Sequence, residues 1–276
     1  EEKIPEIKQQ CKALHKGDLV ILVQSMNFRI SDYRIRMELN TQGILVLEHS
    51  HLQLITEKQI PTYLNSLTYL YPTYKKQATA LNALILKAKK ITVFTSGGNN
   101  LVYEGPFEAV KENIGDLQQT LGSFYPIGEV FTEPCDLTKV NGALAVYAYP
   151  DAHYLTQIVK PFSLTIQEGC IISHDGPEAF EKLLELVRNE TSEKKVHIRE
   201  MGFGLNPFIG KEKPLGYVSA HERQNGFHLS LGLKHGIYRK KLPKHIPQKY
   251  HIDLFADVEE IRIDEKIIFS NRAYCL

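Results

Sequence analysis

The sequence predicts a mixed fold of the α+β or α/β class, in which an N-terminal α/β domain over residues 1–125 precedes a β-rich domain over residues 126–276. Two observations support this prediction. Up to about residue 121, stretches with helical spacing alternate with apolar runs typical of strands. After the segment from Gly122 to Pro126, short strand-like runs separated by glycine, proline and aspartate follow one another, with only one helical stretch among them.

The N-terminal domain is expected to begin with an amphipathic helix, because apolar residues recur at helical spacing over residues 2–15. A continuous apolar run then predicts a buried strand, and two glycine-containing turns each predict a hairpin between flanking strand-like runs. The expected elements in order are a helix at 2–15, a strand at 19–23, a hairpin over 33–48, a helical region at 59–89 interrupted near Pro72, a hairpin of 91–94 with 101–103, and a helix at 106–121.

The C-terminal domain is expected to consist mainly of strands, because its apolar runs are short and bounded by turn residues. Residues 177–189 form the one stretch with helical spacing, and the chain ends in a hairpin. The predicted strands lie at 128–132, 142–149, 162–167, 170–173, 195–200, 215–221, 226–233, 251–255, 261–263 and 267–269.

Composition excludes several classes of protein. The 276 residues are 43% hydrophobic and 24% charged with a net charge of +1, so nucleic acid and anionic membranes are not expected as main partners. No stretch approaches the roughly 20 apolar residues needed to cross a bilayer, and no secretory signal is visible. None of the four cysteines forms a CxxC pair, which favours a reduced compartment and a cytoplasmic location.

Several acidic and imidazole side chains lie inside apolar, strand-like runs, where such groups are costly unless they are paired or bound to a cation. Because side chains alternate along a strand, His228 shares a face with Ser230, and His251 shares a face with Asp253. Two further carboxylates lie in comparable runs, Glu129 and Glu200. Two imidazoles and three carboxylates suit zinc, manganese, cobalt or iron(II), and they suffice for two ions that share a bridging carboxylate.

A purely structural interpretation of these residues is also open. An isolated histidine in a strand is more often a core or surface residue than a ligand, and the tripeptide of histidine, any residue and aspartate is common. Spacing alone therefore favours neither interpretation.

Four short segments resemble those of the thermophilic metallo-aminopeptidase family of the aminopeptidase T type. The family's Gly-Glu-Val-Phe-Thr element is matched at Gly128 to Thr132, and its Glu-Leu-Gly-Ile-Gly-Thr-Asn-Pro element is matched at Glu200 to Pro207. A glycine- and histidine-containing strand follows at Gly226 to Gly232, and a terminal His-x-Asp at His251 to Asp253. The segments occur in the family's order over residues 126–276.

This resemblance implies a pair of divalent metals, a homodimer, and five metal ligands: Glu129, Glu200, His228, His251 and Asp253. It also implies catalytic roles for Glu200 and Glu222, and it draws attention to His235. The family has a tyrosine at that last position, where an imidazole could still donate a hydrogen bond or carry a proton. The N-terminal part of this chain is much shorter than the family's usual domain.

Three functions follow from the site. The first is a metal-dependent, aminopeptidase-like hydrolase of small peptides, with two zinc, cobalt or manganese ions and with Glu200 or Glu222 moving the proton. The second, from a branch that resembles this family, is a dioxygenase that opens hydroxylated pyridine rings with a single iron(II). The third is a non-catalytic relative that binds a peptide or a protein partner. The sequence favours the hydrolase.

Overall fold

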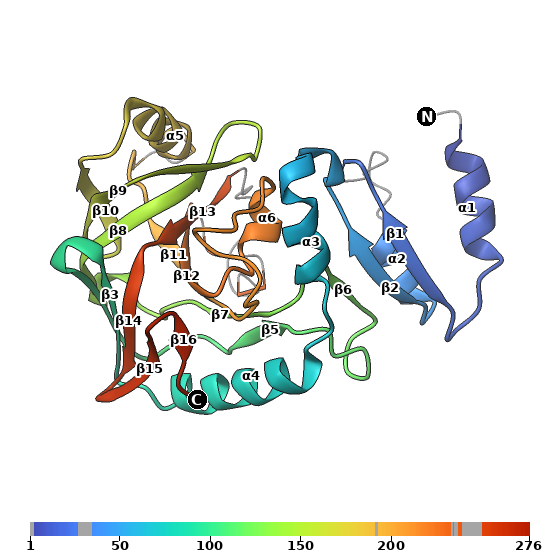
Figure 1. Ribbon diagram of the computed structural model, residues 1–276, viewed down its shortest axis with the longest axis horizontal. Coiled ribbons are helices and arrows are strands. Elements are labelled where there is room, and N and C mark those ends of the chain that lie inside the picture. Colours follow the sequence, from blue (N-terminus) through green and yellow to red (C-terminus); the bar gives the residue numbers. More distant parts are fainter. Residues whose placement is uncertain (1–2, 27–34, 191–192, 233, 235–236, 239–249) are drawn as a thin grey trace.

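The computed structural model describes residues 3–26, 35–190, 193–232, 234, 237–238 and 250–276. These residues form a small parallel sheet and a large, curved antiparallel sheet, with helices packed around them (Figure 1). The fold class predicted from the sequence is confirmed.

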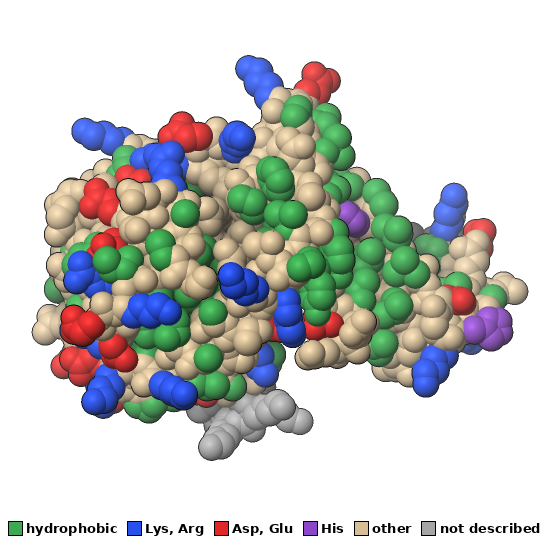
Figure 2. Space-filling view, turned by 60° about the horizontal axis from the view of Figure 1, so that its bottom comes forward, with side chains coloured by type: hydrophobic (Ala, Val, Ile, Leu, Met, Phe, Trp, Pro, Cys, Tyr) green, Lys and Arg blue, Asp and Glu red, His purple; other side chains and the backbone are tan. Residues whose placement is uncertain are grey.

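The small sheet has the strand order β1 (Leu19–Val23), β2 (Leu45–His49) and β6 (Gly122–Phe124). All three strands are parallel. Helices α1 (Ile4–Lys12) and α2 (Ile35–Thr41) pack on one face of this sheet, because Leu39, Val46 and Cys11 share one apolar cluster. On the other face of β1, the side chains of Leu19, Ile21 and Val23 are exposed. Figure 2 shows hydrophobic side chains gathered on one face of the molecule.

The large sheet has thirteen strands among the described residues, and each of its pairs is antiparallel. The order is β16-β15-β14-β3-β4-β8-β13-β12-β11-β7-β5, and β9 pairs with both β8 and β10. The strands are β3 (Lys90–Thr95), β4 (Asn99–Glu104), β5 (Lys111–Asn113), β7 (Glu129–Thr132), β8 (Val140–Pro150), β9 (Thr156–Gln167), β10 (Cys170–His174), β11 (Ile198–Gly204), β12 (Gly226–Gly232), β13 (His251–Ala256), β14 (Val258–Ile263), β15 (Lys266–Ser270) and β16 (Ala273–Tyr274).

Helices cover the large sheet and complete its apolar core. Helix α4 (Tyr71–Ile85) buries Tyr74, Ala78, Leu81 and Ile85, whose spacing of three or four residues puts them on one face of the helix. The remaining helices are α3 (Ile60–Ser66), α5 (Glu178–Arg188), α6 (Val218–His221) and the short 3₁₀ turns Leu52–Leu54, Glu57–Gln59, Ser96–Gly98 and Leu137–Lys139.

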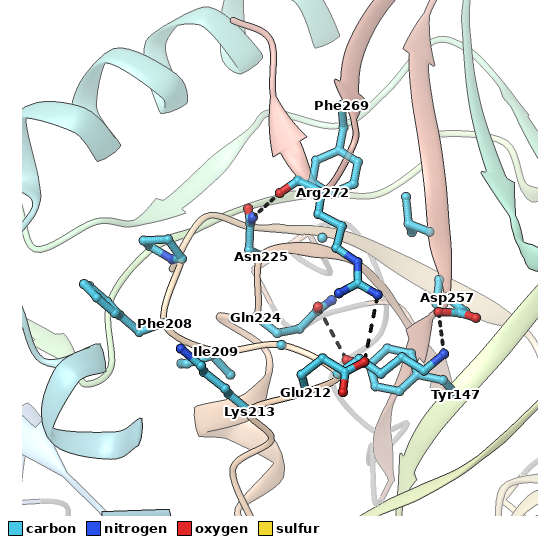
Figure 3. Close-up of a pocket in the computed structure, with 16 residues that line it drawn as sticks. Tyr147, Phe208, Ile209, Glu212, Lys213, Gln224, Asn225, Asp257, Phe269 and Arg272 are labelled. Atoms are coloured by element: carbon cyan, nitrogen blue, oxygen red, sulfur yellow. Dashed lines mark hydrogen bonds and ion pairs between the residues drawn. The ribbon is translucent and has the colours of Figure 1, made fainter. Parts of the chain in front are cut away.

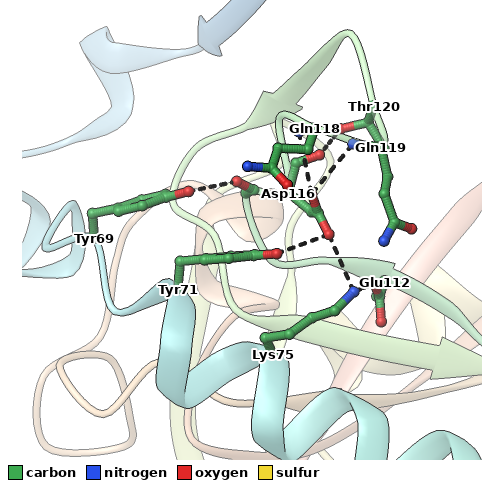
Figure 4. A network of polar contacts seen from close by, with 9 residues as sticks. Tyr69, Tyr71, Lys75, Glu112, Asp116, Gln118, Gln119 and Thr120 are labelled. Atoms are coloured by element: carbon green, nitrogen blue, oxygen red, sulfur yellow. Dashed lines mark hydrogen bonds and ion pairs between the residues drawn. The ribbon is translucent and has the colours of Figure 1, made fainter.

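A polar network attaches the segment between β5 and β6 to the start of α4 (Figure 4). The buried carboxylate of Asp116 accepts hydrogen bonds from the Tyr71 hydroxyl (2.9 Å) and from the Lys75 ammonium (3.1 Å). The backbone amides of Gln118 and Gln119 also donate to Asp116. Because the donors to this carboxylate come both from α4 and from the segment between β5 and β6, the network holds these two parts of the chain together.

Three predicted elements are wrong. Residues 106–121 contain the strand β5 and turns in place of a helix, and Gly115 there has a positive φ of 76°. Residues 35–41 form α2, so the predicted hairpin over 33–48 is absent from the described part of that range, and β2 pairs in parallel with β1 and β6. The predicted strand at 215–221, a range that the structure describes in full, is absent, because Tyr217 makes only an isolated bridge with Leu155 and residues Val218–His221 form the helix α6.

The helical regions at 59–89 and 177–189 and the hairpin of 91–94 with 101–103 are confirmed as α3 with α4, α5, and β3 with β4. The two sheets do not divide at a single point of the chain. Strands β3, β4 and β5 belong to the large sheet, whereas β6 belongs to the small one. A division into domains at residue 125 stays a prediction.

Candidate metal centre

Four neighbouring strands bring the predicted ligands together. Strands β7, β11, β12 and β13 lie side by side in the large sheet, although they are far apart in sequence (Figure 1). Glu129 on β7 lies opposite Gly204 on β11, and His228 on β12 lies opposite Gly202. Asp253 on β13 lies opposite Ser230 on β12. The register therefore places the predicted residues on one connected region of the sheet.

Gly202 is required by the position of His228. A Cβ atom at Gly202 would lie 2.0 Å from both Cε1 and Nε2 of the His228 ring, which is far closer than any van der Waals contact allows. The imidazole thus lies directly over the backbone of β11, where only glycine leaves room.

Glu200 is placed by an irregularity in β11. The register between β11 and β12 shifts between Ile198 and Met201, so the strand has a bulge within the stretch that contains Glu200. Such bulges redirect side chains and are frequent beside functional sites. The backbone amide of Glu200 also donates to the Ser230 hydroxyl (3.0 Å), which fixes this part of the strand against β12.

Glu200 belongs to two groups of candidate ligands. The first group is Glu129, Glu200 and His228, and the second is Glu200, His251 and Asp253. In each group, the ligand atoms lie within 4.8 Å of one another. Four of these five side chains are buried, and the side chain of His251 is 31% exposed. His251 is therefore the most exposed of the five candidate ligands.

Arg223 and Glu222 border the first group. The Arg223 guanidinium contacts Oε2 of Glu129 (2.6 Å) and Oε2 of Glu222 (2.5 Å). Both residues follow α6, which places them beside β12. The buried guanidinium holds both carboxyl groups in place, and removal of Glu129 would leave the charge of Arg223 without its ionised partner.

The two imidazoles carry raised pKa values. Burial disfavours the charged form of His228, but its contacts with Glu129 and Glu200 outweigh burial and raise its pKa to about 10. Burial likewise opposes protonation of His251, and the neighbouring Asp253 carboxylate raises the pKa of His251 to about 10. Without a metal ion, both rings are therefore imidazolium at neutral pH.

The carboxyl groups divide into two kinds. Burial opposes ionisation of Glu129, but the Arg223 guanidinium and the His228 imidazole outweigh it and lower the pKa of Glu129. The pKa of Asp253 is also lowered, because His251 outweighs the effect of burial. In contrast, burial and the negative charge of Asp253 raise the pKa of Glu222 well above its usual value. The surroundings of Glu222 thus favour its protonated form more than those of an exposed carboxyl group do.

The chemistry of this donor set fits a divalent cation. His228 is fully buried, and neither of its ring nitrogens makes a hydrogen bond with the described part of the chain. Its Nε2 lies 3.3 Å from Glu129 and 3.7 Å from Glu200 without hydrogen-bond geometry. A buried ring nitrogen without a hydrogen bond is costly, and a metal ion would satisfy it. Carboxylate oxygens and imidazole nitrogens suit zinc, manganese, cobalt and iron(II).

His235 lies outside the described residues, so its predicted catalytic role stays a prediction.

The structure describes one further residue of this segment that the sequence patterns did not assign. The hydroxyl of Tyr238 donates to the carbonyl of Ala109 (2.8 Å). Burial raises the pKa of Tyr238, and the negative charge of Glu200 adds to this effect. In the sequence, Tyr238 lies three residues beyond His235, the position at which the family has a tyrosine.

The fold and the site together define a mixed α/β protein in which a curved antiparallel sheet carries a candidate divalent-metal centre. Two solved structures are similar to it in fold. The 2,5-dihydroxypyridine dioxygenase from Pseudomonas putida KT2440 matches with a TM-score of 0.63 and 16% identity, over 98% of this chain and 75% of that one. Wild-type AmpT, aminopeptidase T, from Thermus thermophilus matches with a TM-score of 0.62 and 11% identity, over 88% of this chain and 68% of that one.

At these identities, the two likenesses show the fold alone. No protein-family model matches the sequence, and no curated protein matches it. Within the described ranges, no helix has both the length and the apolar character needed to cross a membrane.

Proposed function

We propose that this protein is a metal-dependent, aminopeptidase-like hydrolase that acts on small peptides through two divalent ions, zinc, cobalt or manganese. One observation carries the proposal: Glu200 belongs to both groups of candidate ligands. A carboxylate can bridge two ions at the separation typical of two-metal hydrolytic sites, roughly 3.5–4 Å. The likeness to AmpT supports this proposal at the level of the fold.

Two divalent ions in such a site would polarise the scissile carbonyl and lower the pKa of a bound water. The chain itself would supply positioning and the proton. In the proposal, Glu129, Glu200, His228, His251 and Asp253 hold the ions, and Arg223 fixes the carboxylate of Glu129 (2.6 Å). The raised pKa of Glu222 favours its protonated form, so in the proposal Glu222 protonates the leaving amine.

A second candidate is a ring-cleaving dioxygenase with a single iron(II). It is favoured by the match over 98% of this chain to a dioxygenase and by the group of Glu200, His251 and Asp253, which offers three ligands for one ion. The predicted iron ligands His228, His251 and Asp253 are divided between the two groups. For this reason the hydrolase is preferred. A non-catalytic role remains the third alternative.

The test is peptide hydrolysis by the zinc-, cobalt- or manganese-loaded protein, with Glu222→Gln as the diagnostic variant. Glutamine keeps the size of the side chain but has no acidic proton to transfer to the leaving amine. We expect Glu222→Gln to keep its metal and to lose about 10²- to 10⁴-fold in kcat. The matched control is Glu260→Gln on β14, whose carboxylate contacts Arg262 away from the site.

Two results would contradict the hydrolase. One is a fully metal-loaded wild type that releases no amino acid from any aminoacyl or dipeptide substrate. The other is an unchanged kcat in Glu222→Gln. Consumption of dioxygen with a hydroxylated pyridine by the iron-loaded protein would select the second candidate. A small-peptide substrate, a homodimer and a cytoplasmic location are part of the same proposal.

A further inference from the structure

A cavity of about 250 Å³ opens on the molecule away from the candidate metal ligands (Figure 3). It lies between the loop at residues 207–213, the start of β12, the start of β14 and the hairpin of β15 and β16. None of the five candidate ligands is among its described lining residues. Tyr147 and Gln224 form part of its wall, and both are buried, at 2% and 3% exposed.

About half of the cavity lining is apolar and half is polar. The aromatic rings of Tyr147, Phe208 and Phe269 line it together with Ile209. Its volume is below the range usual for drug-sized ligands, so a small molecule is the appropriate occupant. Such walls would bind an aliphatic or aromatic group of a few carbon atoms.

Charges of both signs are placed at the mouth. The Arg272 guanidinium lies 3.9 Å from the Glu212 carboxylate, and both side chains are 73% exposed. An exposed pair at this distance contributes little stability, so a ligand can exchange partners with it at low cost. Lys213 adds a further cation to the lining. Deeper in the cavity, Lys211 and Asp257 form a closer pair at 2.9 Å.

Arg272 occupies an unfavourable backbone conformation. The turn between β15 and β16 has two residues with positive φ, Asn271 (51°) and Arg272 (58°). Two-residue hairpin turns of this kind favour asparagine followed by glycine, because glycine has no Cβ to clash. Arg272 thus occupies a position whose backbone conformation favours glycine. Backbone strain of this kind is concentrated at functional sites.

We propose that this cavity binds a free α-amino acid with an apolar side chain. Its α-carboxylate would pair with Arg272, its ammonium group with Glu212, and its side chain would contact Tyr147 and Phe269. A dianion such as phosphate is disfavoured by Glu212 and Asp257, and a simple cation by Arg272 and the two lysines. A zwitterion with an apolar group matches both signs of charge and the aromatic walls.

This site goes beyond the proposed metal chemistry and does not depend on it. Its wall is nevertheless connected to the metal centre, because the Tyr147 hydroxyl lies 3.0 Å from Nε2 of His221, the residue before Glu222. Binding is measured without any turnover, so its failure is distinct from failure of the proposed hydrolase.

The experiment is isothermal titration calorimetry of the full chain, as purified and after saturation with zinc, using L-phenylalanine as the probe. We expect the same affinity in both preparations, because the cavity has no candidate metal ligand among its described lining. N-acetyl-L-phenylalanine lacks the ammonium group and L-phenylalaninamide lacks the carboxylate. Both are titrated only into metal-free protein, so that the proposed hydrolase cannot turn them over. Each is expected to bind at least about tenfold more weakly, since each leaves one charge at the mouth unpaired.

Arg272→Gly is the decisive variant, because glycine suits the φ of 58° at this position. It should keep or raise the midpoint of thermal unfolding and reduce the affinity for L-phenylalanine at least about tenfold. The matched control is Arg262→Ala on β14, which removes another Arg–Glu pair outside the cavity and should leave the affinity unchanged. Undetectable binding of L-phenylalanine, equal binding of the three compounds, or full affinity in Arg272→Gly would each overturn the proposal.

Discussion

His228 is the most constrained residue of the candidate metal centre. Its ring lies over Gly202, between the carboxylates of Glu129 and Glu200, and it is fully buried. In the absence of a metal ion, a proton on the ring balances the nearby negative charge, which explains the raised pKa of about 10. A divalent cation would take over this role and displace the proton.

Metal binding is therefore expected to release protons. The pKa values of His228 and His251 are both raised to about 10, so both rings are protonated at pH 7 and must lose their protons to become ligands. We expect release of about two protons per chain at pH 7, and an affinity that rises as the pH increases towards 10. Calorimetric titration with zinc in buffers of different ionisation enthalpy measures this number. Metal binding without proton release would contradict the account.

Gly202→Ala should damage the site selectively. The new Cβ would lie 2.0 Å from two atoms of the His228 ring, so the imidazole must move. We expect a large loss of bound metal, measured by elemental mass spectrometry after equilibration with zinc. The control is Gly210→Ala, since a Cβ there has no atom of the described chain within 4 Å. Full metal content in Gly202→Ala would show that His228 is not a ligand.

The sequence could identify the candidate ligands because an imidazole or a carboxylate in an apolar strand is conspicuous. It could not show that Glu200 belongs to both groups, since this depends on a bulge in β11 and on strand pairing. It also gave no reason to place Arg223 against Glu129, because the arginine reaches that carboxylate from another part of the chain. Proximity in space is the missing information in each case.

At the scale of elements, α5 is joined to the β-sheet by a small ionic cluster. Glu181 on this helix contacts Nε2 of His174 (2.6 Å), at the end of β10, and also pairs with Arg188. The pKa of Glu181 is lowered to about 2, first by the hydrogen bond from Arg188 and then by that from His174. The helix also buries Phe180, Leu184 and two other apolar residues against the core.

Glu181→Gln should lower stability in a pH-dependent way. A carboxyl group with a lowered pKa stabilises the folded protein above its unfolded pKa of about 4.3, and this contribution is lost as the pH falls towards 2. Because the side chain is 38% exposed, we expect a loss below about 1 kcal/mol at pH 7. The difference in thermal midpoint from wild type should shrink between pH 4 and pH 2.

Glu185→Gln is the control for this variant, because Glu185 is an exposed residue of the same helix. It should leave the thermal midpoint close to that of wild type at each pH. A difference between Glu181→Gln and wild type that does not change with pH would contradict the proposed ionic role.

The elements that the sequence predicted correctly have strong local signals. Helices α4 and α5 bury residues at a spacing of three or four, and the hairpin of β3 and β4 encloses two adjacent glycines. The predictions failed where the tertiary context decides. β2 pairs in parallel with two strands distant in sequence, and the short strand β5 is fixed by its neighbour β7 at the edge of the large sheet.

At the scale of the whole molecule, the candidate centre depends on the complete curved sheet. Its side chains come from β7, β11, β12 and β13, so residues between 129 and 253 must be assembled before the ligands meet. Metal that binds only the folded chain stabilises it by mass action. Removing the metal with a chelator is therefore expected to lower the thermal midpoint of the whole protein.

The most direct test of the two-metal account is the metal content per chain, measured by elemental mass spectrometry on wild type, Glu129→Gln and Glu200→Gln after saturation with zinc, manganese or cobalt. We predict about two equivalents for wild type. Glu129→Gln should lose one ion and Glu200→Gln both, because Glu129 belongs to one group and Glu200 to both. No bound metal in wild type under excess ions, or a wild-type content in Glu200→Gln, would contradict the account.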